Sequence, residues 1–110
     1  MSYLKFLTLV QSIRALPSFP MMDSVEEQLL NAFAAAWHTK KPITVVDAMN
    51  IVPEISTATA HRRLKTLRQK GLIALNTDEA DNRVKFIVST PLTKRYFAKL
   101  DECLAKAQSN

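Results

Sequence analysis

The sequence contains very few of the residues from which catalytic and metal sites are built. Its 110 residues include one cysteine, Cys103, and two histidines. A single cysteine excludes an intrachain disulfide and any multi-cysteine metal site. His38 and His61 are not spaced to form a zinc set with it, and no nucleophile is paired with a base. We therefore expect no metal, no cofactor and no enzyme activity.

Glycine and long apolar runs are equally scarce. Gly71 is the only glycine, which excludes a glycine-rich phosphate loop. No stretch reaches the roughly 18 apolar residues of a membrane span, and the apolar run at residues 6–10 is too short for a secretory signal. We expect a cytoplasmic protein with no membrane partner, and the lone cysteine, interpreted as a buried structural thiol, agrees with a reducing compartment.

Acidic residues are the minority among the charges. The chain has 15 Lys and Arg against 10 Asp and Glu, for a net charge of +5. This balance favours a polyanionic partner such as nucleic acid, although only weakly by itself. Hydrophobic residues make up 47% of the chain, which is enough for the core of one small domain.

Proline, glycine and apolar spacing predict a mostly helical fold with a small antiparallel β-hairpin. Apolar residues at helical spacing predict helices over residues 4–16, 24–41, 43–50, 57–70 and 91–107. Strands are expected over 72–75 and 84–88, on either side of a polar loop. In the second strand, Val84, Phe86 and Val88 are expected to share one face.

Capping residues mark the ends of these helices. Ser24 is expected to cap the second helix, with Glu27 completing a capping box. Thr44 and Ser56 are expected to cap the third and fourth. Gly71 falls where the fourth helix needs a left-handed residue at its end.

The fourth helix carries the strongest functional signal. At about 100° per residue, its apolar residues share one side, and the opposite side is basic. Five Lys or Arg and no carboxylate lie between His61 and Lys70. The alternative interpretation is a face that is simply exposed to solvent, but such faces usually carry both positive and negative side chains, which pair at i,i+4 spacing. A basic face fits the major groove of DNA, which is about 12 Å wide.

Arg83, beside Asp81 at the end of the polar loop, offers a second contact. A guanidinium there could enter a narrow minor groove, oriented by Asp81 through a bidentate pair. An ordinary salt bridge at the end of a hairpin is the equally weighted alternative.

Residues 56–73 resemble a motif of the MarR family of bacterial transcriptional regulators, which have a winged helix-turn-helix fold. The motif combines a capping serine, a threonine three residues later, a basic pair, two core leucines, a glycine and two apolar residues. These are Ser56, Thr59, Arg62, Arg63, Leu64, Leu67, Gly71, Leu72 and Ile73. Asp81-Asn82-Arg83 resembles the family's wing tip, and Leu92-Thr93 resembles the start of its next helix. The resemblance spans about residues 24–104.

The resemblance implies a homodimer that binds double-stranded DNA. Residues 1–22 and 91–110 would be dimerisation helices, and 23–90 the DNA-binding domain. Together with the helical projection, it gives as expected DNA-binding residues Thr57, Ala58, Thr59, His61, Arg62, Lys65, Arg68, Gln69 and Arg83. Phosphate contacts are expected from Lys40, Lys41, Arg63, Arg68 and Lys85. A small-molecule effector is possible in such a protein, but no residue of this short chain supports one. The alternative function is a winged-helix module for protein–protein interaction that does not bind DNA.

Overall fold

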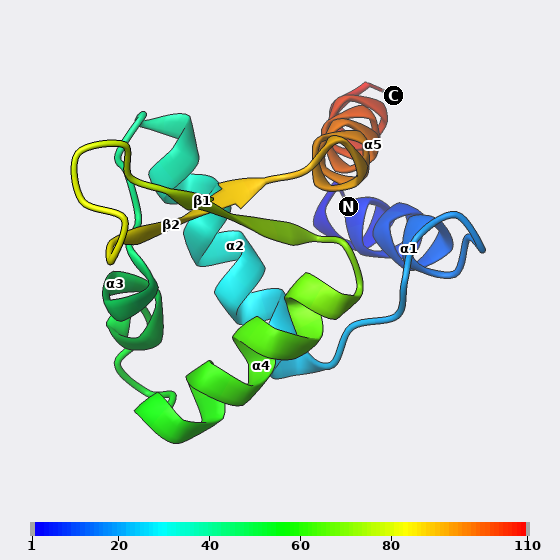
Figure 1. Cartoon of the computed structure of the whole chain (residues 1–110). Coiled ribbons are helices and arrows are strands. Elements are labelled where there is room, and N and C mark those ends of the chain that lie inside the picture. Colours follow the sequence, from blue (N-terminus) through cyan, green and yellow to red (C-terminus); the bar gives the residue numbers. More distant parts are fainter. Residues whose placement is uncertain (1, 110) are drawn as a thin grey trace. The chain divides into compact units, whose positions relative to one another are not determined.

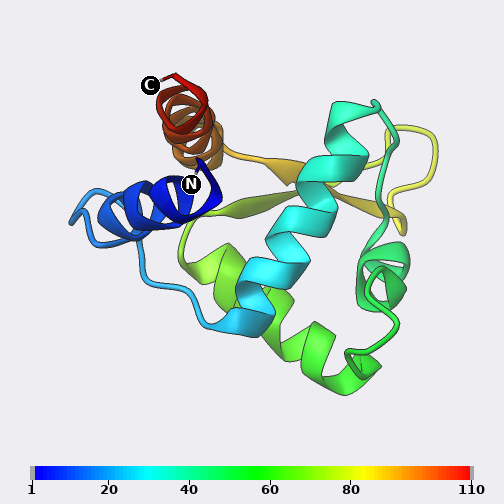
Figure 2. The ribbon, with the colours of Figure 1, turned by 180° about the vertical axis from the view of Figure 1, so that it is seen from behind.

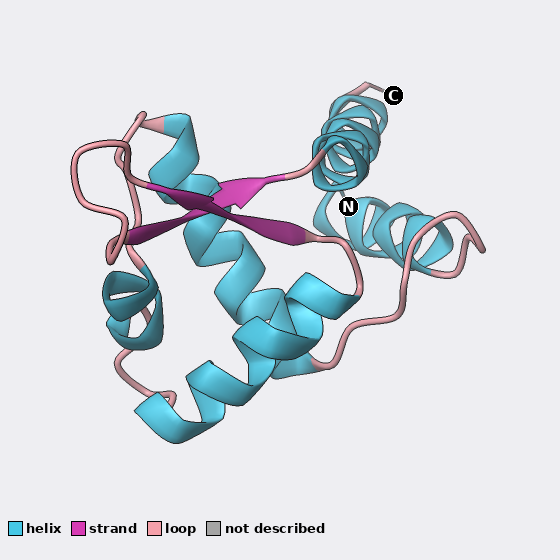
Figure 3. Cartoon of the chain, in the orientation of Figure 1, coloured by secondary structure: helices cyan, strands magenta, loops and turns pink. Residues whose placement is uncertain are grey.

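The computed structural model describes residues 2–109. Its elements in chain order are α1 (Ser2–Arg14), α2 (Ser24–His38), α3 (Val45–Asn50), α4 (Thr57–Gln69), β1 (Ile73–Thr77), β2 (Lys85–Ser89) and α5 (Pro91–Gln108) (Figure 1). The predicted fold class, mostly helical with one antiparallel hairpin, is confirmed (Figure 3). Within residues 2–109, no helix is both long and apolar enough to cross a membrane.

The chain divides into two compact units. The first combines the N-terminal segment through Met21 with the segment from Pro91 onward, and in it α1 packs beside α5 (Figures 1 and 2). The second unit, residues 22–90, holds α2, α3, α4 and the hairpin. The expected role of α1 and α5 in dimerisation stays a prediction.

Aromatic and apolar side chains hold the first unit together. The ring of Phe19 meets the ring of Tyr96 edge-on, with centroids 5.4 Å apart. The Arg14 side chain donates from Nε to the Tyr96 hydroxyl at 3.2 Å. Val10 of α1 and Cys103 of α5 are buried, so the cysteine lies in the apolar seam as a covered thiol.

The core of the second unit lies between α2, α4 and one face of the hairpin. Its buried side chains include Leu29, Leu30, Phe33, Leu64, Leu67, Ile73 and Ile87. The strands pair antiparallel from Ile73↔Ser89 to Thr77↔Lys85, so both begin one residue later than predicted.

Ile87 marks the inward face of β2. Ile87 is the fully buried residue of this strand, whereas Val84, Phe86 and Val88 are only partly covered. Ile87 also donates its backbone N–H to the Ile43 carbonyl at 2.8 Å. Because the core lies on the Ile87 side, the period-two alternation of a strand turns Phe86 and Val88 to the other face.

The predicted cap of α2 is also corrected by one residue. Asp23, not Ser24, is the N-cap, and its side chain accepts from the Glu26 N–H at 2.8 Å. The Glu26 carboxylate accepts from the Asp23 N–H at 3.0 Å, which closes the capping box. The box forms at Glu26 because that side chain points into the fold. The Thr44 and Ser56 caps are confirmed.

Gly71 ends α4 as predicted, in a left-handed conformation with φ of 77°. The Leu72 N–H donates to the Leu67 carbonyl at 3.0 Å, and the Gly71 N–H donates to the Arg68 carbonyl at 3.0 Å. These two bonds make a Schellman motif, which satisfies carbonyls that would otherwise lack partners at the helix end.

The end of α2 repeats this motif without a glycine. The Lys41 N–H donates to the Ala36 carbonyl at 3.0 Å, and the Lys40 N–H donates to the Trp37 carbonyl at 2.9 Å. Lys40 occupies the left-handed position, with φ of 60°. A side chain with a Cβ atom is destabilised there by about 1–2 kcal/mol, so lysine is a less stable choice than glycine.

We expect Lys40→Gly to raise the free energy of unfolding by about 0.5–1 kcal/mol, because relief of the left-handed strain exceeds the added chain entropy of glycine. The matched variant Gly71→Ala should lower it by a similar amount. Denaturant unfolding followed by Trp37 fluorescence measures both. A loss of stability in Lys40→Gly would contradict the interpretation of this helix end.

Candidate nucleic-acid interface

The two sides of α4 divide as the sequence predicts. Ala60, Leu64 and Leu67 are buried. The opposite side is exposed, and it carries Thr57, Ala58, His61, Arg62, Lys65, Arg68 and Gln69. Thr59, the remaining expected contact on this helix, is half-buried. The fold therefore gathers the basic side chains on one accessible surface.

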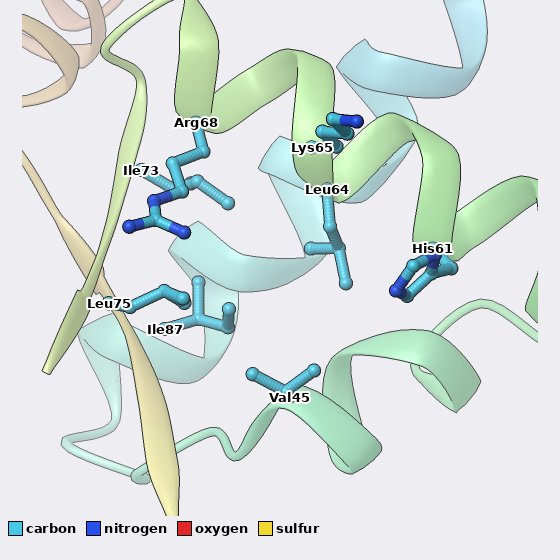
Figure 4. Close-up of a pocket in the computed structure, with 8 residues that line it drawn as sticks. All are labelled: Val45, His61, Leu64, Lys65, Arg68, Ile73, Leu75 and Ile87. Atoms are coloured by element: carbon cyan, nitrogen blue, oxygen red, sulfur yellow. The ribbon is translucent and has the colours of Figure 1, made fainter. Parts of the chain in front are cut away.

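A shallow hollow of about 270 Å³ runs along the edge of α4 that faces the hairpin (Figure 4). Its apolar lining comes from Leu64 and from β1 and β2. His61, Lys65 and Arg68 come from successive turns of α4, and Arg68 reaches toward β1 (Figure 4). No described residue that lines the hollow is acidic, so the positive field of this edge is not neutralised locally.

Thr59 has a role that the sequence did not indicate. Its hydroxyl oxygen accepts from the Ser56 hydroxyl at 2.9 Å and from the Arg62 guanidinium at 3.3 Å. Ser56 in turn accepts from the Thr59 N–H at 3.1 Å. The helix cap is thereby linked to Arg62, and Thr59 restrains the guanidinium that was expected to read a base.

A buried carboxylate that sequence reasoning missed holds the other edge of α4. Glu26 of α2 is 2% exposed. Its carboxylate accepts from the Lys70 ammonium at 2.8 Å and from the Thr66 hydroxyl at 2.9 Å. Burial by itself would raise the pKa of Glu26, but hydrogen bonds from Lys70, from the Asp23 N–H and from Thr66 outweigh it and lower the pKa.

Arg63 is held by α2 in the same way. Its Nε lies 2.9 Å from an oxygen of the Asp23 carboxylate, and its side chain is 35% exposed. The phosphate contact expected of Arg63 stays a prediction. Two of the five basic residues of this segment, Arg63 and Lys70, are partly exposed and paired with carboxylates, while Arg62, Lys65 and Arg68 are exposed.

The loop between the strands, residues 78–84, is called the wing below. At its end, Arg83 forms the bidentate pair with Asp81 that the sequence left as one alternative. Nε lies 3.0 Å from one carboxylate oxygen, and Nη2 lies 3.1 Å from the other. The hydrogen bonds of Arg83 lower the pKa of Asp81. The Arg83 side chain is still 87% exposed, so a hairpin-end salt bridge and an oriented, accessible arginine coexist.

Comparison with solved structures identifies the fold. The heme sensor protein PefR from Streptococcus agalactiae, in complex with heme, is 23% identical and has a TM-score of 0.62 over 97% of this chain and 67% of its own. The transcriptional regulator Tm0710 from Thermotoga maritima is 15% identical, with a TM-score of 0.64 over 96% of this chain and 66% of its own. Staphylococcus aureus MarR, in complex with salicylate and kanamycin, is 23% identical, with a TM-score of 0.62 over 96% and 65%.

The chain has a MarR-like winged-helix fold. The resemblance drawn from residues 56–73 is thus confirmed at the level of the fold. In this MarR-like fold the chain spans about two thirds of the length of the compared structures. No protein-family model matches the sequence, and no curated protein matches it.

The depressed pKa of Glu26 predicts a loss of stability in acid. In the folded chain this pKa lies below its ordinary value of 4.5, so the unfolded chain takes up the proton more readily. The contribution of Glu26 is therefore complete above pH 4.5 and disappears as the pH falls through the folded pKa.

Glu26→Gln should lower the free energy of unfolding near neutral pH by about 2 kcal/mol, since it removes charged hydrogen bonds. It should also flatten the pH dependence below pH 4.5. Asp101→Asn, at an exposed position of α5, serves as the control. Equal acid sensitivity of Glu26→Gln and the unmodified chain, in urea unfolding at several pH values, would contradict this assignment.

Proposed function

We propose that the chain is a transcription regulator that binds double-stranded DNA as a homodimer and inserts α4 into the major groove. The observation that carries this proposal is the exposed face of α4, which presents Arg62, Lys65 and Arg68 with no carboxylate among them. Its MarR-like fold supports the proposal, since regulators such as Tm0710 share it.

Base reading and backbone binding fall to different residues of α4. We infer that Arg62 reads a base edge, because Thr59 restrains its guanidinium and arginine can bond guanine through two donors. Lys65, an exposed and flexible point charge, suits a phosphate. Thr57 and Ala58 lie at the exposed start of the helix, where small side chains allow a close approach. His61, Arg68 and Gln69 complete the contact face.

The wing would contribute Arg83 to the adjacent minor groove. Its guanidinium is exposed and its direction is set by Asp81. A narrow minor groove concentrates negative potential and attracts such a side chain. Because the Asp81 carboxylate partly neutralises the Arg83 guanidinium, the contribution of Arg83 to binding should depend on the width of the minor groove more than on base identity.

Homodimerisation is inferred from apolar side chains that the first unit leaves exposed. Tyr3 and Leu4 of α1 are 66% and 56% exposed, and Leu7 and Leu104 are also exposed. On the helix, Tyr3, Leu4 and Leu7 lie next to one another. A second copy would cover them and would present two α4 helices to half-sites about one helical turn apart.

Arg62→Ala should weaken binding to the chain's preferred DNA site by about 1–3 kcal/mol and relax base choice at one position. Lys65→Ala should weaken binding to all sequences and reduce the salt dependence. Selection from random duplexes followed by fluorescence anisotropy measures both effects. Lys94→Ala, at an exposed position of α5, is the control for lost charge. An unchanged sequence preference in Arg62→Ala would refute its role in base reading.

Filter binding of random duplex DNA at two salt concentrations separates DNA binding from the alternative, a protein-interaction module. Neutralised phosphates release counterions, so DNA affinity should fall steeply as salt rises. Little binding at either concentration would reject the proposed function and favour the alternative.

Leu4→Glu combined with Leu7→Glu should convert the dimer to a monomer, because a charge buried in an apolar interface is strongly unfavourable. Sedimentation velocity over a range of protein concentrations measures the change. Ser12→Glu, at an exposed polar position of the same helix, should leave the dimer intact. A monomeric unmodified chain would show that these side chains do not mediate self-association.

A further inference from the structure

A second basic hollow lies away from the contact face of α4. It has a volume of about 380 Å³ and forms between the end of α2 and the hairpin. Two aromatic side chains, Trp37 and Phe86, contribute its apolar walls, and Lys40, Lys41 and Asn76 contribute polar groups. The Trp37 indole N–H donates to the Ile87 carbonyl at 3.1 Å, which fixes the ring in the wall.

This hollow and the hollow beside α4 share Ile87 but are otherwise lined by different strand residues. Ile73, Leu75 and Ile87 line the hollow beside α4. Phe86 and Asn76 are cross-strand partners, and the alternation of a strand places them on the other face. Lys40 and Lys41 line this hollow and not the one beside α4.

The positive charge of this hollow is not balanced by carboxylates. No described residue that lines it is acidic. Hydrogen bonds from Thr44, and to a smaller extent the charge of Lys41, lower the pKa of the nearby Asp47, which does not line the hollow. An acidic ligand would thus meet two ammonium groups beside an aromatic wall.

Lys40 gives an independent indication that its side chain has a role here. The same backbone motif ends α4 with Gly71 and α2 with Lys40. A lysine in the left-handed region is less stable than glycine. Residues held in such conformations cluster at functional sites, and the side chain is what distinguishes the end of α2 from the end of α4.

We propose that this hollow binds an acidic segment of a partner protein, with an aromatic or aliphatic side chain anchored between Trp37 and Phe86. Charge complementarity selects the acidic residues, and the aromatic walls provide the buried anchor that a peptide interface needs. DNA is disfavoured as the occupant, because a duplex offers no apolar anchor for these walls. The proposal stands whether or not α4 binds DNA.

The experiment is a display selection of random 12-residue peptides on the immobilised full chain, with Lys40→Gly/Lys41→Gln as the counter-selection target. Lys40→Gly relieves a strained residue, so lost binding would not reflect unfolding. Enriched peptides should be acidic with at least one aromatic or aliphatic residue. They should change the fluorescence of Trp37, the only tryptophan in the chain, and their Kd should rise about tenfold in the double variant. Lys94→Gln should bind as the unmodified chain does.

Three outcomes would overturn the proposal. The first is enrichment with no acidic bias over the counter-selection. The second is peptide binding that leaves Trp37 fluorescence unchanged. The third is a loss of random-duplex affinity in Lys40→Gly/Lys41→Gln that matches the loss in Lys65→Ala, which would assign the hollow to DNA. If α4 fails to bind DNA but the acidic peptides bind, the proposed function fails and this inference survives.

Discussion

The buried carboxylate of Glu26 is the constraint on which the proposed interface depends. A charge that is 2% exposed must be compensated by close partners, because desolvation alone would destabilise the folded chain. The compensation comes from Lys70 and Thr66 at the end of α4 and from the N-cap of α2. One side chain therefore caps α2 and also sets where α4 lies against it. The nearby pair of Asp23 and Arg63 adds a second link between the same two helices.

This arrangement is also related to the charge of the outer face of α4, whose charged side chains are all positive. The two carboxylates contributed by α2 neutralise the basic residues on the inner edge and leave Arg62, Lys65 and Arg68 without acidic neighbours on the helix. Like charges three and four residues apart destabilise an isolated helix. The Ser56 cap and the buried leucines of α4 offset that cost in the folded chain. A polyanion would remove the repulsion, which links the stability of α4 to the function proposed for it.

Local signals predicted α4 well and its surroundings poorly. Ser56, Gly71 and the leucine spacing are all read within one stretch of sequence, so both ends and both faces of this helix were predicted. The cap of α2 was misplaced because Asp23 and Ser24 are equally good N-caps. The choice between them depends on Lys70, a contact partner 44 residues beyond Glu26. The sequence predicted that Val84, Phe86 and Val88 share one face of β2, but it did not indicate that the core lies on the opposite, Ile87 face. The bond between Arg62 and Thr59 depends on rotamers that composition does not reveal.

The two Schellman motifs separate what a backbone needs from what a side chain adds. At the end of α4, glycine relieves the left-handed position, and the hydrogen bonds account fully for the residue. At the end of α2, the same bonds form around Lys40, so the backbone alone would favour glycine there as well. At equal backbone geometry, the two helix ends differ by the lysine side chain. At Lys40 that side chain lines a hollow with Trp37, Lys41 and Phe86.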